Sequence, residues 1–129
     1  MIENTIEAWH EAVKSRDPSM LDALLHEDAV FHSPVVFKPQ QGKVLTKMYL
    51  MAAFKVFFSD DFTYVREIIG ETDAVLEFTT TIDGIVINGV DMVTWGEDGR
   101  ITDFKVMLRP LKAINLIHQK MAQMLVRTA

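Results

Sequence analysis

The second half of the chain restricts the fold more than any other feature of the sequence. Four apolar runs rich in β-branched and aromatic residues follow one another at residues 62–69, 74–82, 85–95 and 101–108. Their connections are short, and Asp83-Gly84 between two apolar runs is a strong hairpin signal. Strands joined by so few residues pair antiparallel. This half of the chain therefore predicts a four-stranded antiparallel meander.

Two helices are predicted ahead of the first strand. The first is indicated by apolar residues at the spacing of one helix face: Ile2, Ile6, Trp9 and Val13. Asp17-Pro18 then resembles a helix start, with aspartate as the N-cap and proline at the first helical position. A short second helix should follow, with an apolar stripe of Met20, Leu21, Leu24 and Leu25.

Four further segments complete the predicted order. Residues 28–33 are rich in strand formers and end at a proline, whereas residues 34–42 hold two prolines and a glycine and predict a loop. Residues 43–58 are apolar almost all round, so this third helix should be buried on more than one side. Pro110 opens an amphipathic C-terminal helix over residues 110–127, which could cap a pocket or extend a dimer interface. Its predicted apolar stripe is Leu111, Ile114, Ile117, Met121, Met124 and Leu125.

This order predicts one α+β domain over residues 1–129, with a core at residues 2–108 and helices packed on one face of a curved sheet. The net charge of -5 argues against nucleic acid or an anionic membrane as a partner. There is no cysteine, no metal-binding spacing and no nucleotide-binding motif, so no cofactor and no metal are expected. No secretion signal or membrane-spanning stretch is visible, and a cytoplasmic protein is expected.

Asp91 needs an explanation because it interrupts an apolar strand. A buried carboxylate without a partner neutralises or finds a hydrogen-bond network. A protonated acid in an apolar pocket is also a strong donor that can hold a developing oxyanion. Strand alternation places Ile87, Val93 and Trp95 on the face of Asp91, as a pocket floor requires. Two interpretations stay open: a pocket acid, or a structural acid bonded to a tryptophan or tyrosine.

The order of elements resembles the nuclear transport factor 2-like superfamily, whose cone-shaped α+β fold has a curved, mostly antiparallel sheet. Its members include ketosteroid isomerases, SnoaL-like polyketide cyclases and limonene epoxide hydrolases. Residues 14–34 are similar to its helix-helix-strand opening, and residues 88–101 are similar to its last hairpin. The resemblance covers residues 2 to about 108 and leaves the C-terminal helix as an addition. It implies the fold and leaves the function open, because this scaffold hosts many activities.

Ketosteroid isomerases carry a tyrosine on the first helix, a carboxylate base after the first strand and a protonated aspartate on a late strand. By this resemblance Asp91 keeps the acid, Trp9 stands at the tyrosine position and Ser33 stands at the base position. An indole N–H can donate a hydrogen bond but does not usefully transfer a proton, and a hydroxyl does not take up a proton as a carboxylate does. The resemblance therefore argues against steroid isomerase chemistry of that type.

His32 is the candidate base for an acid at Asp91, and its alternative is a histidine on the sheet rim. Adjacent strand residues point to opposite faces, so His32 and Ser33 should not both line a cavity without a bulge. His10, His26 and His118 are expected on helix surfaces. The candidate ligand-binding residues, each with a plain core role as its alternative, are Trp9, Phe31, Ser33, Met48, Phe54 and Trp95.

Both faces of residues 85–95 are rather apolar, which predicts a homodimer that covers the outer face of the sheet. The first function hypothesis is a SnoaL-like, cofactor-free lyase, isomerase, cyclase or hydrolase that acts on a small apolar carbonyl or epoxide. Asp91 would be the acid or oxyanion donor, Trp9 would orient the substrate and His32 would be the base. The alternatives are a non-catalytic module that binds a small apolar molecule, and a dimeric scaffold domain.

Overall fold

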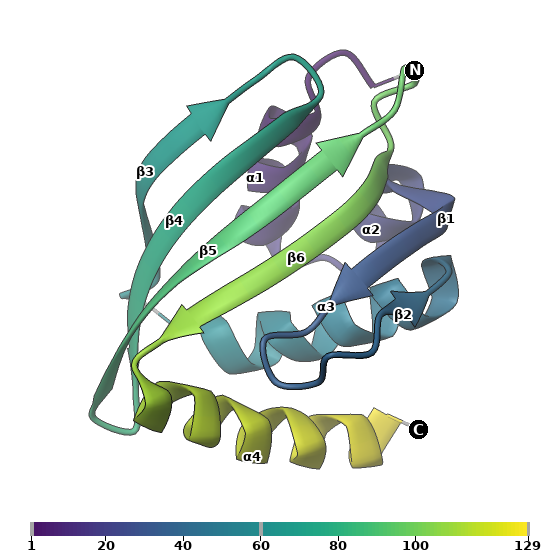
Figure 1. The fold of residues 1–129 in the computed structure, drawn as a ribbon. Coiled ribbons are helices and arrows are strands. Elements are labelled where there is room, and N and C mark those ends of the chain that lie inside the picture. Colours follow the sequence, from purple (N-terminus) through teal and green to yellow (C-terminus); the bar gives the residue numbers. More distant parts are fainter. Residues whose placement is uncertain (1, 60, 129) are drawn as a thin grey trace.

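The structure, a computed structural model, describes residues 2–59 and 61–128, with side chains as far as Leu125 (Figure 1). Its elements are α1 (Thr5–Ser15), α2 (Ser19–Leu24), β1 (Leu25–His32), β2 (Gln40–Gln41), α3 (Lys43–Phe57), β3 (Thr63–Ile69), β4 (Asp73–Ile82), β5 (Ile85–Trp95), β6 (Ile101–Arg109) and α4 (Leu111–Thr128). The predicted order of helices and strands is confirmed, with one short strand added.

A six-stranded sheet in the order β2-β1-β6-β5-β4-β3 forms one layer of the fold. The predicted meander is confirmed, because β3 to β6 pair antiparallel with their neighbours along the chain. β1 joins the edge of the meander by pairing parallel to β6. Figure 1 shows α1, α2 and α3 behind the curved sheet and α4 along its lower end. The α+β class with a C-terminal helix is therefore confirmed.

Two glycines shape the β4–β5–β6 region. Asp83 and Gly84 both have positive φ angles, 51° and 77°, which is the geometry of the tight hairpin turn that this pair predicts. Gly89 lies on the inner face of β5, where a side chain would overlap Phe78 and Leu108. The ring of Phe78 can therefore lie directly against the backbone of β5.

The inner face of β5 follows the predicted alternation. Ile87, Asp91 and Val93 are buried, whereas Val86 and Met92 are exposed on the opposite face. Val93 belongs to the larger of two core clusters, with apolar side chains of α1 and α3, and Ile87 belongs to the second, with side chains of α3 and α4. Asp91 thus sits at the interface of the sheet and the helices, at 7% exposure.

Local sequence did not predict three features of the backbone. Gln40 and Gln41 form β2 within the expected loop, because they pair with β1. β1 begins at Leu25 rather than at residue 28, so α2 ends one residue earlier, at Leu24. Asp17 accepts hydrogen bonds from the amide and hydroxyl of Ser19, so its carboxylate satisfies the start of α2 although Pro18 occupies the cap position.

The buried stripe of α4 is rotated from the predicted one. Leu111 is 71% exposed, while Ala113 and Ile117 are fully buried. Ile117 was expected in the apolar stripe and Ala113 was not. α4 packs on α3, β6 and β5, so three neighbouring elements, rather than the helical period alone, select the face that α4 buries.

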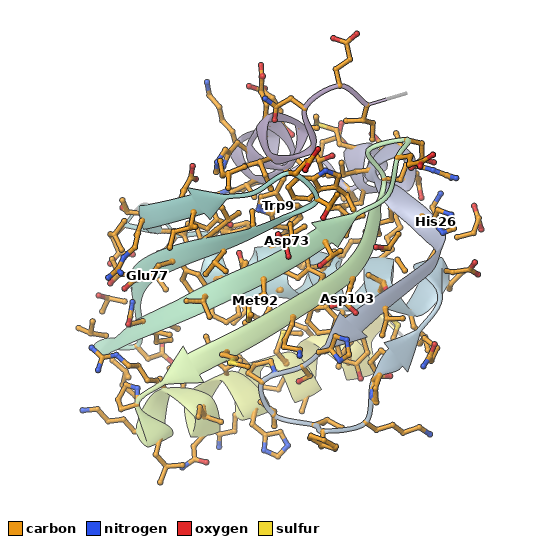
Figure 2. All side chains as sticks on the ribbon, turned by 45° about the horizontal axis from the view of Figure 1, so that its top comes forward. Trp9, His26, Asp73, Glu77, Met92 and Asp103 are labelled. Carbon is orange, nitrogen blue, oxygen red and sulfur yellow. The ribbon has the colours of Figure 1, made fainter. Side chains whose placement is uncertain are left out.

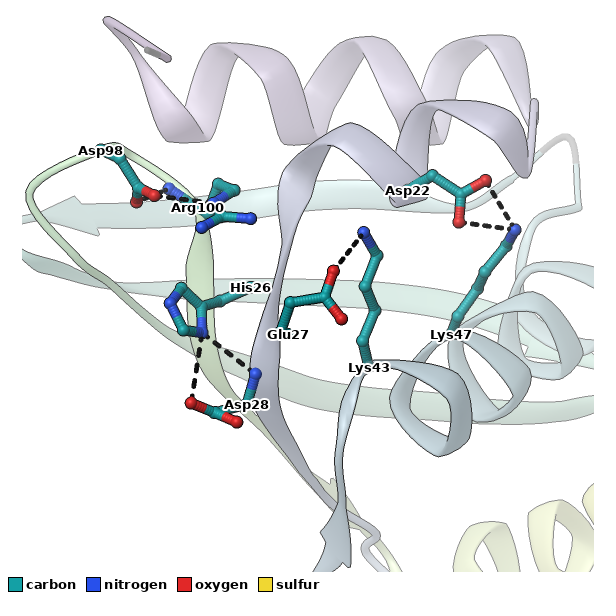
Figure 3. A network of polar contacts seen from close by, with 8 residues as sticks. All are labelled: Asp22, His26, Glu27, Asp28, Lys43, Lys47, Asp98 and Arg100. Carbon is teal, nitrogen blue, oxygen red and sulfur yellow. Dashed lines mark hydrogen bonds and ion pairs between the residues drawn. The ribbon is translucent and has the colours of Figure 1, made fainter.

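A group of charged residues joins α2, β1, α3 and the β5–β6 turn at the surface (Figure 3). It contains the ion pairs Lys47–Asp22, Lys43–Glu27 and Arg100–Asp98. The acidic partner of each pair is at least two-fifths exposed. Pairs of this kind each contribute at most about 1 kcal/mol to the free energy of unfolding. These ion pairs connect elements at the surface of the fold.

Candidate functional site

Asp91, Tyr64 and Trp9 form a chain of hydrogen bonds between the sheet and α1. The indole Nε1 of Trp9 donates to the Tyr64 hydroxyl at 2.9 Å, and that hydroxyl donates to Oδ2 of Asp91 at 2.8 Å. Figure 2 shows Trp9 on the helix side of the sheet, opposite Met92 and Glu77 on the outer side. Trp9 donates to Tyr64 and Tyr64 donates to Asp91, so the acid is the final acceptor of the chain.

The strand register brings Tyr64 and Asp91 to one face. Asp91 pairs with Leu76 on β4, and Tyr64 pairs with Phe78 two residues further along β4. A bulge follows, because Arg66 pairs with Glu77 and leaves Val65 as an extra residue. Tyr64 therefore faces inward, and its side chain reaches Asp91 across β4.

Burial changes the proton affinity of both groups. Desolvation raises the pKa of Asp91 from 3.8 to about 7, although the hydrogen bond from Tyr64 opposes this rise. Burial, together with the nearby Asp91 charge, raises the pKa of Tyr64 well above its usual 10. Near neutrality Tyr64 keeps its proton, and Asp91 is present in both protonation states. In the neutral form one carboxyl oxygen accepts from Tyr64 while the acid retains an O–H of its own to donate.

Asp91 lines a small inner chamber of about 30 Å³. This volume corresponds to about one water molecule. Its walls are mostly aromatic, and Asp91 is the one ionisable residue among the described residues that line it. We define the inner chamber by its lining: Trp9, Leu50, Ala53, Phe54, Phe57, Phe58, Phe62, Phe78, Asp91, Phe104 and Val106. The chamber holds a single small group beside an acid.

A larger outer chamber of about 200 Å³ lies beside the inner one. Ala53, Phe57 and Val106 line both chambers, so the two adjoin at these residues. We define the outer chamber by the rest of its lining: Phe31, Ser33, Pro34, Val35, Val36, Tyr49, Ile117, His118, Met121, Ala122 and Leu125. α4 supplies five of these residues and therefore forms a pocket wall, as one of its two predicted roles requires.

The predicted ligand-binding residues divide into three groups. Trp9 and Phe54 line the inner chamber, and Phe31 and Ser33 line the outer chamber. Met48 lies in a separate surface depression with Asp22 and two lysines of α3. Trp95 is half-buried near the other end of β5 and packs against the core without lining either chamber.

His32 does not meet Asp91. Its neighbour Phe31 points inward, and the His32 imidazole Nε2 bonds to Asp103 Oδ1 at 2.8 Å on the outer face. Strand alternation accounts for this placement, since Phe31 and Ser33 take the inner side. The hypothesis that His32 is the base for Asp91 is therefore withdrawn.

Of the other three histidines, two lie on helices as expected and one does not. His26 belongs to β1 rather than to a helix. His10 lies on α1, where its Nε2 pairs with Glu67 at 2.6 Å and its ring packs edge-on against Tyr64. His118 is on α4 as expected, but it lines the outer chamber.

A second group of hydrogen-bonded polar residues lies on the outer face of the sheet. Glu77 accepts a hydrogen bond from Asn88 Nδ2 at 3.0 Å and pairs with Arg66. Arg109 Nε donates to Asn88 Oδ1 at 2.9 Å. These residues form a ladder across the outer face and are not part of either chamber.

Tyr64 is the functional residue that sequence reasoning missed. The open alternative for Asp91 named a tyrosine partner without identifying it. The pattern in Phe62-Thr63-Tyr64 offered a signal, because two aromatic residues spaced by two share one strand face. The bulge at Val65 shifts the later residues of β3, so alternation along the whole run does not show which face is inner.

Tyr64→Phe is expected to lower the free energy of unfolding at pH 6 by about 1–3 kcal/mol, because it leaves the Trp9 N–H without its acceptor. The same change should raise the pKa of Asp91 further, because the Tyr64 hydrogen bond lowers that pKa. Urea unfolding and a carboxyl titration measure the two effects. Tyr49→Phe is the matched control, since the Tyr49 hydroxyl has no hydrogen-bond partner within the described residues. An equal loss in both variants would contradict the role of the network.

Two further observations concern metals and membranes. Among residues 2–59 and 61–128, no group of three or more histidine or acidic side chains is placed to hold a metal ion. Within the same residues, none of the helices is both long and apolar enough to span a bilayer.

Comparisons with known proteins place the chain in a family. Residues 6–104 match the model of the SnoaL-like domain, and no curated protein matches the sequence. A solved steroid delta-isomerase from Pseudomonas aeruginosa is 36% identical, with a TM-score of 0.90 over 96% of this chain and 90% of that one. An uncharacterized bacterial protein with a cystatin-like fold from Silicibacter pomeroyi DSS-3 is 34% identical, with a TM-score of 0.85 over 92% and 83%.

A more distant structure shares the fold alone. An NTF2-like protein of unknown function from Mesorhizobium loti is 17% identical, with a TM-score of 0.70 over 82% of this chain and 88% of that one. The family model and the two closer structures agree with the architecture described above. The chain is thus a member of the SnoaL-like domain family within the nuclear transport factor 2-like superfamily.

Proposed function

We propose that this protein binds a small, apolar, carbonyl-bearing molecule and that neutral Asp91 donates a hydrogen bond to the carbonyl oxygen. The observation that carries the proposal is a single acid in an otherwise apolar chamber that has room for one small group. A carbonyl oxygen is an acceptor of that size. The ring or chain that bears it would occupy the larger outer chamber.

The hydrogen-bond network explains why Asp91 would act as a donor. Its Oδ2 already accepts the Tyr64 proton, and the Trp9 N–H is already used on Tyr64. With both neighbours committed, an acceptor entering the chamber finds the O–H of neutral Asp91. Burial keeps a large share of Asp91 neutral near pH 7, because the pKa is raised to about 7.

Isomerase-type turnover is the second candidate, and it rests on the 36% identity to a steroid delta-isomerase. Such a reaction would move a proton from a carbon beside the carbonyl to another carbon while Asp91 holds the developing enolate oxygen. It needs a second group to carry that proton. Among the described residues that line the inner chamber, Asp91 is the one group that titrates. Ligand binding with a polarised carbonyl is therefore the function that the site supports best.

The predicted homodimer also remains a proposal. Val86, Met92 and Met107 are exposed on the outer face, beside the Arg66–Glu77 ion pair. A face that carries apolar groups and both signs of charge can match a second copy of itself. The molecular mass in solution tests this expectation.

Acetophenone is a suitable probe of the site. The wild type should bind it at pH 6 and bind it more weakly at pH 8.5, where only a small fraction of Asp91 is protonated. For a pKa of about 7 the affinity should fall about thirtyfold, in proportion to the competent fraction. Asp91→Asn keeps a donor that does not titrate, so its affinity should be nearly independent of pH. Calorimetric titration of both proteins at both pH values makes the comparison.

Pro34→Ala is a control that changes the outer wall without touching Asp91. It should keep the wild-type dependence on pH even where the affinity itself changes. Equal wild-type affinities at pH 6 and pH 8.5 would refute a protonated Asp91 as the donor.

A further inference from the structure

Two polar side chains line the outer chamber and have no part in the proposed function. Ser33 stands at the start of the loop after β1, and His118 stands on α4; both line the chamber. Most of the remaining lining is apolar, including Phe31, Ile117 and Met121. Two hydrogen-bonding side chains from distant parts of the sequence thus meet the same cavity.

The hydroxyl of Ser33 is arranged as a donor. Its Oγ accepts the backbone N–H of Val35 at 3.0 Å and that of Val36 at 3.3 Å. These two bonds use the acceptor capacity of the oxygen. The proton of the hydroxyl has no acceptor within the described residues, so it is available to an oxygen atom on a ligand.

His118 is also uncommitted. Its imidazole makes no hydrogen bond or ion pair with the side chains described, which are those of residues 2–59 and 61–125, in contrast to His10, His26 and His32. The residue is exposed and also lines the chamber, so it lies where the chamber meets solvent. A ring N–H at this place can donate to an oxygen atom on a ligand in the chamber.

The sizes of the chambers limit the ligand. A volume of about 200 Å³ is somewhat larger than the roughly 150 Å³ apolar cavity that is known to hold benzene. The inner chamber has room for one oxygen-sized group. A single six-membered ring with a substituent at each end therefore matches the combined space.

We propose that Ser33 and His118 form a second recognition site for an oxygen acceptor at the far end of the ligand. The preferred ligand is then a one-ring compound with a carbonyl-type oxygen at each end, one at Asp91 and the other at Ser33 and His118. This inference rests on the proposed function, which places the first oxygen at Asp91. Through His118, α4 would then select between ligands of similar size.

The test compares 1,4-diacetylbenzene with 4-ethylacetophenone, which has nearly the same shape and lacks the second oxygen. At pH 6 the wild type should bind the diketone about three- to tenfold more tightly than the monoketone, beyond the twofold that symmetry provides. His118→Leu and Ser33→Ala should each reduce this preference, and the double variant should abolish it. In His118→Leu and Ser33→Ala the affinity for 4-ethylacetophenone should fall less than the affinity for the diketone, because the monoketone has no second oxygen for these residues to bind.

Gln119→Ala is the matched control, because Gln119 is the next residue of α4, is exposed and does not line the chamber. His118→Leu keeps the test decisive if Ser33→Ala disturbs the loop that its hydroxyl holds. A wild type without the preference, or a double variant that retains it, would overturn the second site. The acetophenone dependence on pH would still stand in that case. If neither ketone binds the wild type, the second site and the proposed function are both refuted.

Discussion

Asp91→Asn is expected to be more stable than the wild type at pH 8, by about 4 kcal/mol in the free energy of unfolding. At pH 4 the difference should shrink toward zero. The side chains have nearly the same shape, and the asparagine carbonyl can still accept the hydrogen bond from Tyr64. The variant therefore removes the buried charge while keeping the packing and one hydrogen bond.

The sign follows from proton binding. The folded pKa of Asp91 is about 7, above the value of 3.8 of an unperturbed aspartate. Between these values the folded protein binds more protons than the unfolded chain, so stability decreases as pH rises. The contribution of protonated Asp91 to the free energy of unfolding is fully present below about pH 4. It is lost progressively up to about pH 7 and changes no further above that.

Urea unfolding of both proteins at pH values from 4 to 9 measures the difference. Asp73→Asn is the matched control, because Asp73 is exposed at the start of β4 and lines neither chamber, so the change removes a surface carboxylate and leaves the network intact. Asp17, Asp22, Asp61 and Asp98 have lowered pKa values, so their contributions are lost only as pH falls through those values. They are present in both proteins and cancel in the comparison. A difference that does not change between pH 5 and pH 8 would contradict a neutral buried Asp91.

Trp9→Ala should lower the free energy of unfolding by about 4 kcal/mol, through lost burial and the cavity that it leaves. Trp9 is 1% exposed, and its ring lies 5.7 Å from Phe54 and 4.8 Å from Phe104, centre to centre. The variant also removes the indole N–H that Tyr64 accepts. Denaturant unfolding at pH 6 measures the loss.

Two other variants separate the contributions. Trp9→Phe retains an aromatic ring but no N–H, so it should cost about 1–3 kcal/mol. Trp95→Ala removes the other tryptophan, which is only half-buried, and should cost less than Trp9→Ala. An equal loss from the two alanine variants would show that Trp9 is not the anchor of the network.

The network changes what the resemblance to ketosteroid isomerases means for this chain. By the resemblance, Trp9 stands where the first helix of those enzymes carries a tyrosine, so no phenol was expected beside Asp91 from that helix. The structure supplies a phenol from β3, because Tyr64 donates to Asp91 while Trp9 donates to Tyr64. Ser33 still stands at the position of the carboxylate base. The site is therefore equipped to hold a carbonyl oxygen, and a proton-transfer partner for it is not found in the inner chamber among the described residues.

Local patterns predicted the parts of this fold that local forces determine. β5 was predicted with its observed bounds, because an apolar run between turn signals is a strand wherever the sheet forms around it. Alternation predicted that Ile87 and Val93 share the face of Asp91, and the structure shows that this face is the buried one. The turn at Asp83 and Gly84 followed from its demand for positive φ angles.

Features that depend on distant partners were not predictable from one sequence. β2 exists because β1 is there to pair with it, and Gln40-Gln41 carries no strand signal of its own. The link between Tyr64 and Asp91 depends on the bulge in β3 and on the register across β4. The placement of His118 depends on which face α4 turns toward α3.

Asp91 is a buried acid that is mostly protonated below about pH 6 and present in both forms near pH 7. Carbon-13 NMR of the aspartate side-chain carboxyl groups, with Asp91 assigned from the Asp91→Asn spectrum, measures its titration directly. We expect a midpoint at about pH 7, well above the 3.8 of an unperturbed aspartate, and a still higher midpoint in Tyr64→Phe. A midpoint at or below pH 4 would contradict it, because Asp91 would then be an ionised structural acid with no proton to donate.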